Sequence, residues 1–276
     1  MGQRIFSTVL LWSLVAAALW FLRTAGALVL LAAFSLLTLG EFYQLMRASG
    51  YRPFLRLGIG FGLLVTMAPV LEAWWGFNSL LPLGLATVTF AVRLLGERTP
   101  ESRVESFAST LFGLVYVAFM LQFLVRIVTP LPGDTVSADG RLLLGLWVVA
   151  VAKFCDMGAL LTGLACGRHR MSPVVSPKKT WEGAGGGVVV SMAVGAGIAW
   201  LARDQFPAHL TPLVAALLAA PLAVLAIVAD LVESMIKRRA NRKDSGSLIP
   251  GLGGFFDTSD SLILVAPVAY LVFDLP

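Results

Sequence analysis

The sequence predicts an all-α, polytopic integral membrane protein with about nine transmembrane helices and a cytoplasmic N-terminus. Of its 276 residues, 58% are hydrophobic and only 13% are charged, about half the charged fraction of a soluble domain. Apolar runs of about 20 residues recur along nearly the whole chain, which is long enough to cross a bilayer as helices. Basic residues gather in alternate loops, as they do on the cytoplasmic side of membranes.

Nine apolar segments are predicted to cross the membrane. They cover approximately residues 5–22, 25–46, 55–73, 78–95, 106–127, 141–166, 184–202, 211–233 and 259–274. Helices are expected throughout, because backbone groups in hydrocarbon must be hydrogen-bonded and no alternating pattern predicts a barrel. Arg4 ahead of the first run is also typical of a signal peptide, but other spans follow at once, so we interpret this run as an uncleaved helix.

The distribution of basic residues predicts the orientation. Most lysines and arginines precede the first segment or follow the second, fourth, sixth and eighth, which places those positions in the cytoplasm and the C-terminus outside. The two long polar loops, residues 167–183 and 234–258, then face the cytoplasm. The net charge of +5 is explained by this orientation and does not indicate a nucleic-acid partner. We expect a multi-pass protein of the cell (inner) membrane with its active site on the cytoplasmic side.

The chain is expected to form one integral membrane unit with two regions. Residues 1–140 are interpreted as a scaffold of transmembrane helices that also serves dimer or lipid contacts, and residues 141–276 as the catalytic region. Both cysteines lie in an apolar segment, so no disulfide framework is expected. Small residues at i,i+4 spacing predict close helix packing in the sixth and seventh segments. They are Cys155, Ala159, Gly163 and Gly167 in the sixth, and Gly183, Gly187, Ser191 and Gly195 in the seventh.

A polar stripe marks the end of the eighth segment. Asp230, Glu233, Ser234, Lys237 and Arg238 follow i, i+3, i+4, i+7, i+8 spacing, which places them on one helix face. An ordinary helix end with an i,i+4 ion pair and basic residues against the dipole accounts for the last members. It does not account for Asp230, because a carboxylate within a span is costly and marks a functional site.

A polar loop follows the stripe and leads to two more acids. "KDSGSLIPGLGG" contains Lys243, Asp244 and several glycines, and glycines let backbone N–H groups approach phosphate, although they also simply make turns. Asp257 and Asp260 open the ninth segment. Taken alone, they fit an ordinary helix start, with an N-cap and a first-turn acid, as well as they fit a functional site. Antiparallel neighbouring helices would bring Asp230, Asp257 and Asp260 to similar depth. Grouped carboxylates require a cation, and oxygen ligands favour Mg²⁺ with substrate phosphates in its remaining positions.

The other cytoplasmic loop adds more cations. Ser176 and the proline after it fit a helix N-cap and first helical position, followed by Lys178 and Lys179, although the lysines also serve as topology determinants. Lys153 and Asp156 lie within the sixth segment, where they neutralise each other or face a polar cavity. Glu41, a lone acid near a helix end, is interpreted as interfacial, and so is His169.

The run from Asp230 to Asp260 resembles the signature of phosphatidate cytidylyltransferases, also called CDP-diacylglycerol synthases. The matching residues are Ser234, Lys237, Arg238, Lys243, Asp244, Gly246, Pro250, Gly251, Gly253, Gly254, Asp257 and Asp260. "SPKKTWEG" and "DMGALLTG" resemble the second loop of that family and the span before it. Three positions depart from the pattern: Leu252 replaces a frequent histidine, Thr258 a frequent arginine, and Ala229 a frequent glycine. The resemblance covers most of residues 150–276.

The resemblance implies transfer of CMP from CTP to phosphatidate, giving CDP-diacylglycerol and pyrophosphate for phospholipid synthesis. Under this interpretation Asp230, Asp257 and Asp260 hold Mg²⁺, with K⁺ as a candidate second cation. Lys237 and Lys243 join Asp230 and Asp257 as catalytic residues. Substrate binding is assigned to Ser176, Lys178, Lys179, Ser234, Arg238, Asp244, Gly253 and Gly254. The partners are CTP, phosphatidate and membrane lipids. The sequence leaves open whether the chain forms a homodimer. The alternatives are a cytidylyltransferase for another lipid phosphate and an ion-coupled transporter.

Overall fold

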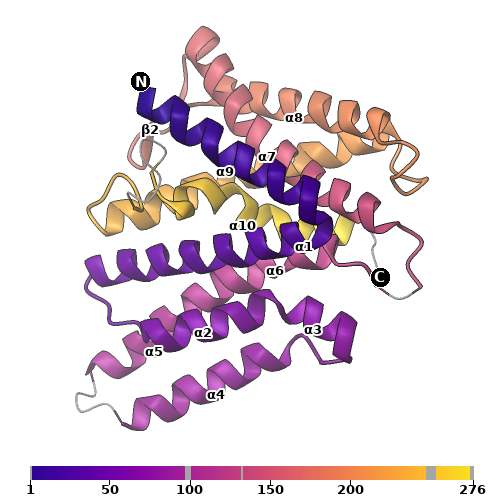
Figure 1. Ribbon diagram of the computed structural model, residues 1–276. Coiled ribbons are helices and arrows are strands. Elements are labelled where there is room, and N and C mark those ends of the chain that lie inside the picture. The colour runs from indigo at the N-terminus through magenta and orange to yellow at the C-terminus, as the bar shows by residue number, and fades with distance from the viewer. Residues whose placement is uncertain (1, 97–100, 132, 247–252, 274–276) are drawn as a thin grey trace. The chain divides into compact units, whose positions relative to one another are not determined.

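The computed structural model describes residues 2–96, 101–131, 133–246 and 253–273, and most of these residues are helical (Figure 1). The all-α class is therefore confirmed. One antiparallel hairpin is also present, formed by β1 (Arg170–Ser172) and β2 (Ser176–Thr180). The chain folds into two compact units, each made of two stretches. The first unit contains residues 1–129 and 236–259, and the second contains residues 130–235 and 260–276.

The first unit consists mainly of the N-terminal helices. They are α1 (Gly2–Ala48), α2 (Leu55–Thr66), α3 (Ala68–Trp75), α4 (Leu81–Leu95), α5 (Glu101–Gly113), the π-helical segment η1 (Leu114–Phe119) and α6 (Met120–Val128). Helix α1 is kinked at Arg23, whose φ of 46° is not helical. The core of this unit is aromatic, because Phe42 packs against Tyr43, Phe112 and Tyr116. These contacts fix α1 against η1.

The second unit is built around two closely packed helices, α7 (Ala138–Cys166) and α8 (Trp181–Leu201), which lie side by side in Figure 1. A Cβ atom on Gly187 would lie 2.7 Å from the carbonyl oxygen of Cys155, so only glycine allows this approach. The Ser191 hydroxyl donates to the Val151 carbonyl at 2.8 Å. The small-residue stripes thus form the helix contact that the sequence predicts.

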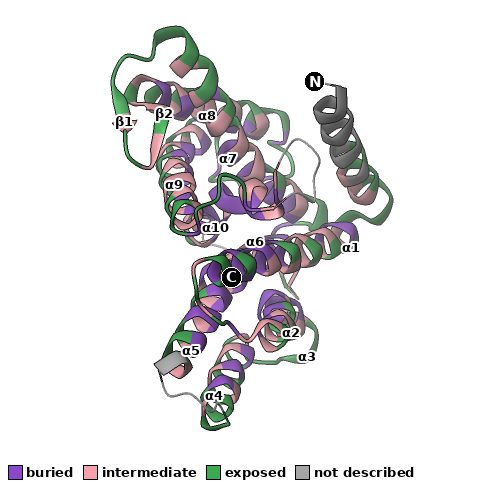
Figure 2. Ribbon diagram, turned by 90° about the vertical axis from the view of Figure 1, so that its left-hand side faces the viewer, coloured by how far each residue is buried: buried purple, intermediate pink, exposed green. Residues whose placement is uncertain are grey.

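Two more helices complete the second unit, α9 (Pro212–Arg239) and α10 (Phe255–Val272). The last residues of α9 and the first residues of α10 belong to the first unit. Trp147 is fully buried, and its indole N–H donates to the Gly195 carbonyl at 2.9 Å while its ring packs edge-on against Phe273. Buried residues recur along most of α10 (Figure 2).

The connection before α7 is held by a buried ion pair. Arg141 and Asp134 have side chains that are 0% and 5% exposed, and the guanidinium Nε donates to the Asp134 carboxylate. Burial by itself would raise the pKa of Asp134, but the hydrogen bond and charge of Arg141, with two backbone N–H donors, lower it below its usual value. Ser137 caps α7 by accepting from the Gly140 N–H at 3.1 Å.

The number of spans differs from the prediction. Within the described residues, six helical stretches are long and apolar enough to cross a membrane, or seven if α2 and α3 form one span bent by 47°. The predicted number was nine, and each of the nine segments overlaps a helix. Helix α4 has 15 residues, about 22 Å, whereas the hydrocarbon core is about 30 Å thick. Residues 5–22 and 25–46 form one kinked helix, and Pro69 interrupts the third segment between α2 and α3.

Candidate active site

Three carboxylates come together in the second unit. Asp230 and Glu233 lie one turn apart on α9, and Asp260 lies on α10. One oxygen from each side chain lies within 4.8 Å of the others. Glu233 and Asp260 are buried, and Asp230 is partly buried. The spacing of the α9 residues places both acids on one helix face, and the packing of the second unit supplies the third acid.

Two lysines surround this carboxylate group. Lys179, on β2, forms an ion pair with Asp230. The ammonium of Lys153 lies 3.6 Å from a carboxylate oxygen of Asp156 and 3.6 Å from one of Asp260, and it donates to the Ser261 hydroxyl at 2.8 Å. The sequence left open whether Lys153 and Asp156 only neutralise each other. The structure connects both to the acid of α10.

The carboxylate group has the chemistry of a magnesium site. All its donors are carboxylate oxygens, which Mg²⁺ prefers at about 2.1 Å in octahedral geometry. Ligands of one such ion lie about 3.0 to 4.2 Å apart, and the three oxygens already lie within 4.8 Å of one another. The residues present therefore fit Mg²⁺. Glu233 belongs to this group, although the sequence analysis interpreted it only as part of the stripe.

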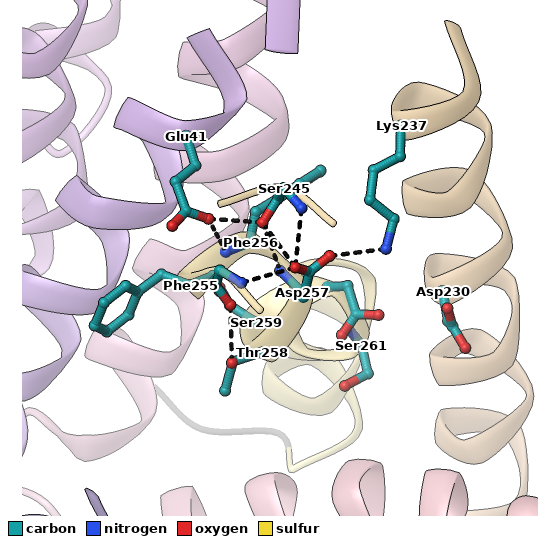
Figure 3. Close-up of polar contacts among 12 residues, drawn as sticks. Glu41, Asp230, Lys237, Ser245, Phe255, Phe256, Asp257, Thr258, Ser259 and Ser261 are labelled. Atoms are coloured by element: carbon teal, nitrogen blue, oxygen red, sulfur yellow. Dashed lines mark hydrogen bonds and ion pairs between the residues drawn. The ribbon is translucent and has the colours of Figure 1, made fainter. Parts of the chain in front are cut away.

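Asp257 has a different set of hydrogen bonds, which join it to residues of the first unit (Figure 3). Its Oδ1 accepts from the Lys237 ammonium at 2.7 Å. Its Oδ2 accepts from the backbone N–H groups of Ser245 and Gly254 at 3.0 and 2.8 Å, and it lies 3.1 Å from the Ser245 hydroxyl oxygen. In the described residues Asp257 thus joins the end of α9, the loop that follows it and the start of α10. The structure brings Asp230 and Asp260 together, and Asp257 is not part of that carboxylate group.

Local backbone geometry shapes the end of α9 and the start of α10, the two segments that carry Lys237 and Asp257. Helix α9 ends at Arg239, and Asn241 adopts a left-handed φ of 53°. The Arg242 N–H then bonds the Lys237 carbonyl at 2.9 Å, which closes the helix end. At the start of α10, Gly253 has a φ of 96°, and a Cβ there would lie 2.5 Å from the Asp257 carboxylate. Glycine is required at this position.

The second polar loop differs from its prediction. Ser176 is not a helix N-cap, because Ser176–Thr180 forms strand β2 and α8 begins at Trp181. Thr180 is the cap, and its hydroxyl accepts from the Gly183 N–H at 3.1 Å. Pairing of β2 with β1 overrides the serine-proline signal. Ser176 is partly buried, whereas Lys178 is exposed.

Several predicted substrate-binding residues lie at the surface. Arg238, Lys243 and Asp244 are exposed, and Ser234 is partly buried. The His169 side chain is 78% exposed, and its Nδ1 lies 2.5 Å from a Glu182 oxygen. The positions Pro250, Gly251 and Leu252 lie outside the described residues. Thr258, which replaces the frequent arginine, donates to the Gly254 carbonyl at 3.1 Å.

Glu41 is not interfacial as predicted. It is 2% exposed, and its Oε2 accepts from the Ser245 hydroxyl at 2.7 Å and the Phe256 N–H at 2.9 Å (Figure 3). The sequence offered one signal, an acid in a long apolar run, but not the partner, which lies 204 residues away.

Comparison with known proteins decides the family. A model of the cytidylyltransferase family matches residues 2–275. This chain belongs to that family. The cytidylyltransferase-family match includes both the carboxylate group and the loop around Asp257, and it extends the predicted resemblance to nearly the whole chain.

Curated relatives agree with the family match. The chain is 31% identical over 291 aligned positions to a phosphatidate cytidylyltransferase of Synechocystis, covering 97% of this chain and 94% of the relative. It is 32% identical over 214 positions to one of Thermotoga maritima, covering 76% of each. A third relative, the protein YnbB of Escherichia coli, is 37% identical over 58% of this chain and 49% of its own length. With its apolar helices, the cytidylyltransferase-family chain is a multi-pass membrane protein.

Proposed function

We propose that this protein transfers CMP from CTP to phosphatidate, forming CDP-diacylglycerol and pyrophosphate for phospholipid synthesis. The observation that carries the proposal is the group formed by Asp230, Glu233 and Asp260, whose oxygens lie within 4.8 Å of one another in a member of the cytidylyltransferase family. The names of the relatives support phosphatidate as the acceptor.

The reaction needs little acid–base chemistry. A phosphate monoester has a second pKa of about 6, so the acceptor is largely a dianion at neutral pH. One of its oxygens attacks the α-phosphorus of CTP, the bond from that phosphorus to the bridging oxygen breaks, and pyrophosphate leaves with the bond electrons. Catalysis then consists of bringing two anions together and stabilising negative charge.

The basic residues of the chain are suited to the first task. We assign Lys237, Arg238 and Lys243 to the phosphates of CTP or the lipid, and Lys178 and Lys179 to the same anions from the hairpin. Asp244 and Ser234 orient these groups, and Ser176, Gly253 and Gly254 line the phosphate path. Lys237 is already held by Asp257 at 2.7 Å, which lowers the entropy lost when it binds phosphate.

We assign Mg²⁺ to Asp230 and Asp260, with Glu233 added from the structure. Both oxygens of Asp257 already accept hydrogen bonds, and we assign this residue instead to holding Lys237. A bound Mg²⁺ would neutralise charge on the phosphoryl oxygens and on the departing pyrophosphate. Ion pairs with Lys179 and Lys153 hold the carboxylates of Asp230 and Asp260 in place. K⁺ is a candidate for a second cation.

We also propose that nine spans place both polar loops in the cytoplasm. Each predicted segment overlaps a helix, and the excess of basic residues after the even-numbered spans favours this orientation. CTP would then arrive from the cytoplasm, while the lipid enters from the membrane with its phosphate at the inner interface.

The experiment that tests the function uses purified protein in nanodiscs with [α-³²P]CTP, phosphatidate and MgCl₂. The expected result is labelled lipid that is extractable into chloroform, with pyrophosphate released in equal amount. Asp260→Asn should abolish labelling, and Glu72→Gln, distant in sequence from every proposed site residue, should retain it. A folded wild-type protein that labels no phosphatidate would refute the proposal. Labelling of another lipid phosphate instead, or ion uptake into vesicles without labelling, would support the corresponding alternative.

A further inference from the structure

Helix α1 docks one face against the start of α10 within the first unit. Phe34 packs edge-on against Phe255, with ring centroids 5.1 Å apart. Four residues further along, the Thr38 hydroxyl lies 2.5 Å from the Ser259 hydroxyl. Glu41 follows on the same face, because residues 34, 38 and 41 are spaced by one helical turn each. The N-terminal helix therefore supports the segment that carries the proposed site residues of α10.

Glu41 is the polar centre of this contact. Its Oε2 accepts from the Ser245 hydroxyl and the Phe256 N–H. Cβ atoms built on Gly246 and Gly254 would lie 2.4 and 2.1 Å from its carboxylate oxygens, so the two flanks of the loop close directly over it. A carboxylate that is 2% exposed is costly unless its hydrogen bonds are satisfied. A role in organising the loop between α9 and α10 accounts for the burial of the Glu41 carboxylate at this position.

Ser245 connects Glu41 to the Asp257 carboxylate. The hydroxyl oxygen lies 2.7 Å from Glu41 Oε2 and 3.1 Å from Asp257 Oδ2. A hydroxyl has one proton, and the shorter contact favours donation to Glu41. The same oxygen then accepts from the Asp257 N–H at 3.4 Å. Asp257 in turn holds Lys237, so the contacts form a continuous path from α1 to a proposed phosphate-binding cation.

We propose that Glu41 is a positioning residue for the nucleotide: through Ser245 and the Phe256 N–H it fixes the Asp257 carboxylate and, through Asp257, the Lys237 ammonium. The inference rests on the proposed function, because it concerns the same reaction. It assigns a role in the active site to the N-terminal half of the chain, which the sequence analysis interpreted as scaffold.

The test measures CTP binding as well as turnover. Full-length wild type, Glu41→Gln, Ser245→Ala and the double variant are placed in nanodiscs, and [α-³²P]CTP binding is measured with MgCl₂ and no phosphatidate. Glu41→Gln keeps the size of the side chain but removes its charge, so the hydrogen bonds from the Ser245 hydroxyl and the Phe256 N–H are no longer charge-assisted. It should raise the Kd for CTP about tenfold, the effect of one lost charge-assisted hydrogen bond. Turnover at saturating CTP should fall by less than about threefold.

Non-additivity separates positioning from general destabilisation. If Glu41 acts through Ser245, the double variant should bind CTP no more weakly than Glu41→Gln alone. Glu72→Gln is the matched control, because it breaks the Glu72–Arg126 pair in the same unit. It should lower the thermal unfolding temperature and leave the Kd for CTP within twofold.

Three results would overturn the inference. They are a Kd within twofold of wild type for both single variants, single effects that multiply in the double variant, and a Glu72→Gln control that weakens CTP binding as much as Glu41→Gln does. If Glu41→Gln does not fold, Ser245→Ala decides, since it removes only a hydroxyl and should still raise the Kd. A wild-type protein that makes no labelled lipid refutes the proposed function instead, which keeps the two failures distinct.

Discussion

The ion pair between Lys237 and Asp257 should contribute measurably to folding in the absence of substrate. The two side chains are only 15% and 13% exposed, and the ammonium lies 2.7 Å from Oδ1. At an effective dielectric constant of about 20, unit charges at this distance attract by about 6 kcal/mol. Desolvation of both groups offsets much of this attraction, which leaves about 2 to 3 kcal/mol for a charge-assisted hydrogen bond.

A double-mutant cycle with Lys237→Met and Asp257→Asn measures this coupling. Each single variant removes the charge-assisted contact from a partly buried group, so each should lower the thermal unfolding temperature by about 5 to 10 °C, at about 2 to 4 °C per kcal/mol. The double variant should be about 2 kcal/mol more stable than the sum of the single effects predicts. The assay is thermal unfolding by circular dichroism in one detergent, without nucleotide or Mg²⁺.

A second pair provides the reference. Glu72 and Arg126 lie 2.5 Å apart with side chains 38% and 22% exposed, and their cycle should give a coupling below about 1 kcal/mol. If the Lys237 and Asp257 effects add to within about 0.5 kcal/mol, the claim that Asp257 holds Lys237 ready for phosphate is refuted.

Three further outcomes are expected. Asp260→Asn should weaken Mn²⁺ binding at least tenfold by electron paramagnetic resonance titration; unchanged affinity would remove this residue from the proposed metal ligands. Gly253→Ala forces a side chain into a φ of 96° at a cost of about 1 to 2 kcal/mol, and should raise the KM for CTP, whereas Gly60→Ala, with open space around it, should not. Asp134→Asn should cost about 3 kcal/mol at pH 7, because it removes the carboxylate from a buried ion pair with Arg141. The folded pKa of Asp134 is lowered, so its contribution is lost as pH falls below about 4. An unfolding difference that persists unchanged at pH 3 would contradict this origin.

The catalytic half of the sequence contained enough local information to predict much of the carboxylate group. Asp230 stands out because an acid within an apolar helix is costly, and its helical spacing from Glu233 and Ser234 follows directly from chain order. Asp260 was added because an antiparallel neighbouring helix would bring it to a similar depth. The structure brings Asp230 and Asp260 together with Glu233. Glu233 was placed on the same polar stripe but not among the metal ligands, since spacing alone does not show which neighbour an acid faces.

Local sequence signals failed where long-range contacts decide the conformation. Ser176 and its proline fit a helix start, but pairing with β1 turns this stretch into a strand and moves the cap to Thr180. The count of nine spans stays a prediction, and hydropathy does not reveal the kink at Arg23 or the 47° bend between α2 and α3.

Composition and periodicity by themselves determined that this protein is a helical membrane protein, because apolar length and basic loops are properties of single segments. The motif from Asp230 to Asp260 likewise determined the family, since its residues are near one another in the chain. Only the tertiary structure decided the surroundings of Asp257 and Glu41. The Glu41 carboxylate of α1 and the Ser245 hydroxyl, 204 residues away in the loop after α9, meet because α1 packs against the start of α10, and that contact is not encoded in the spacing of either segment.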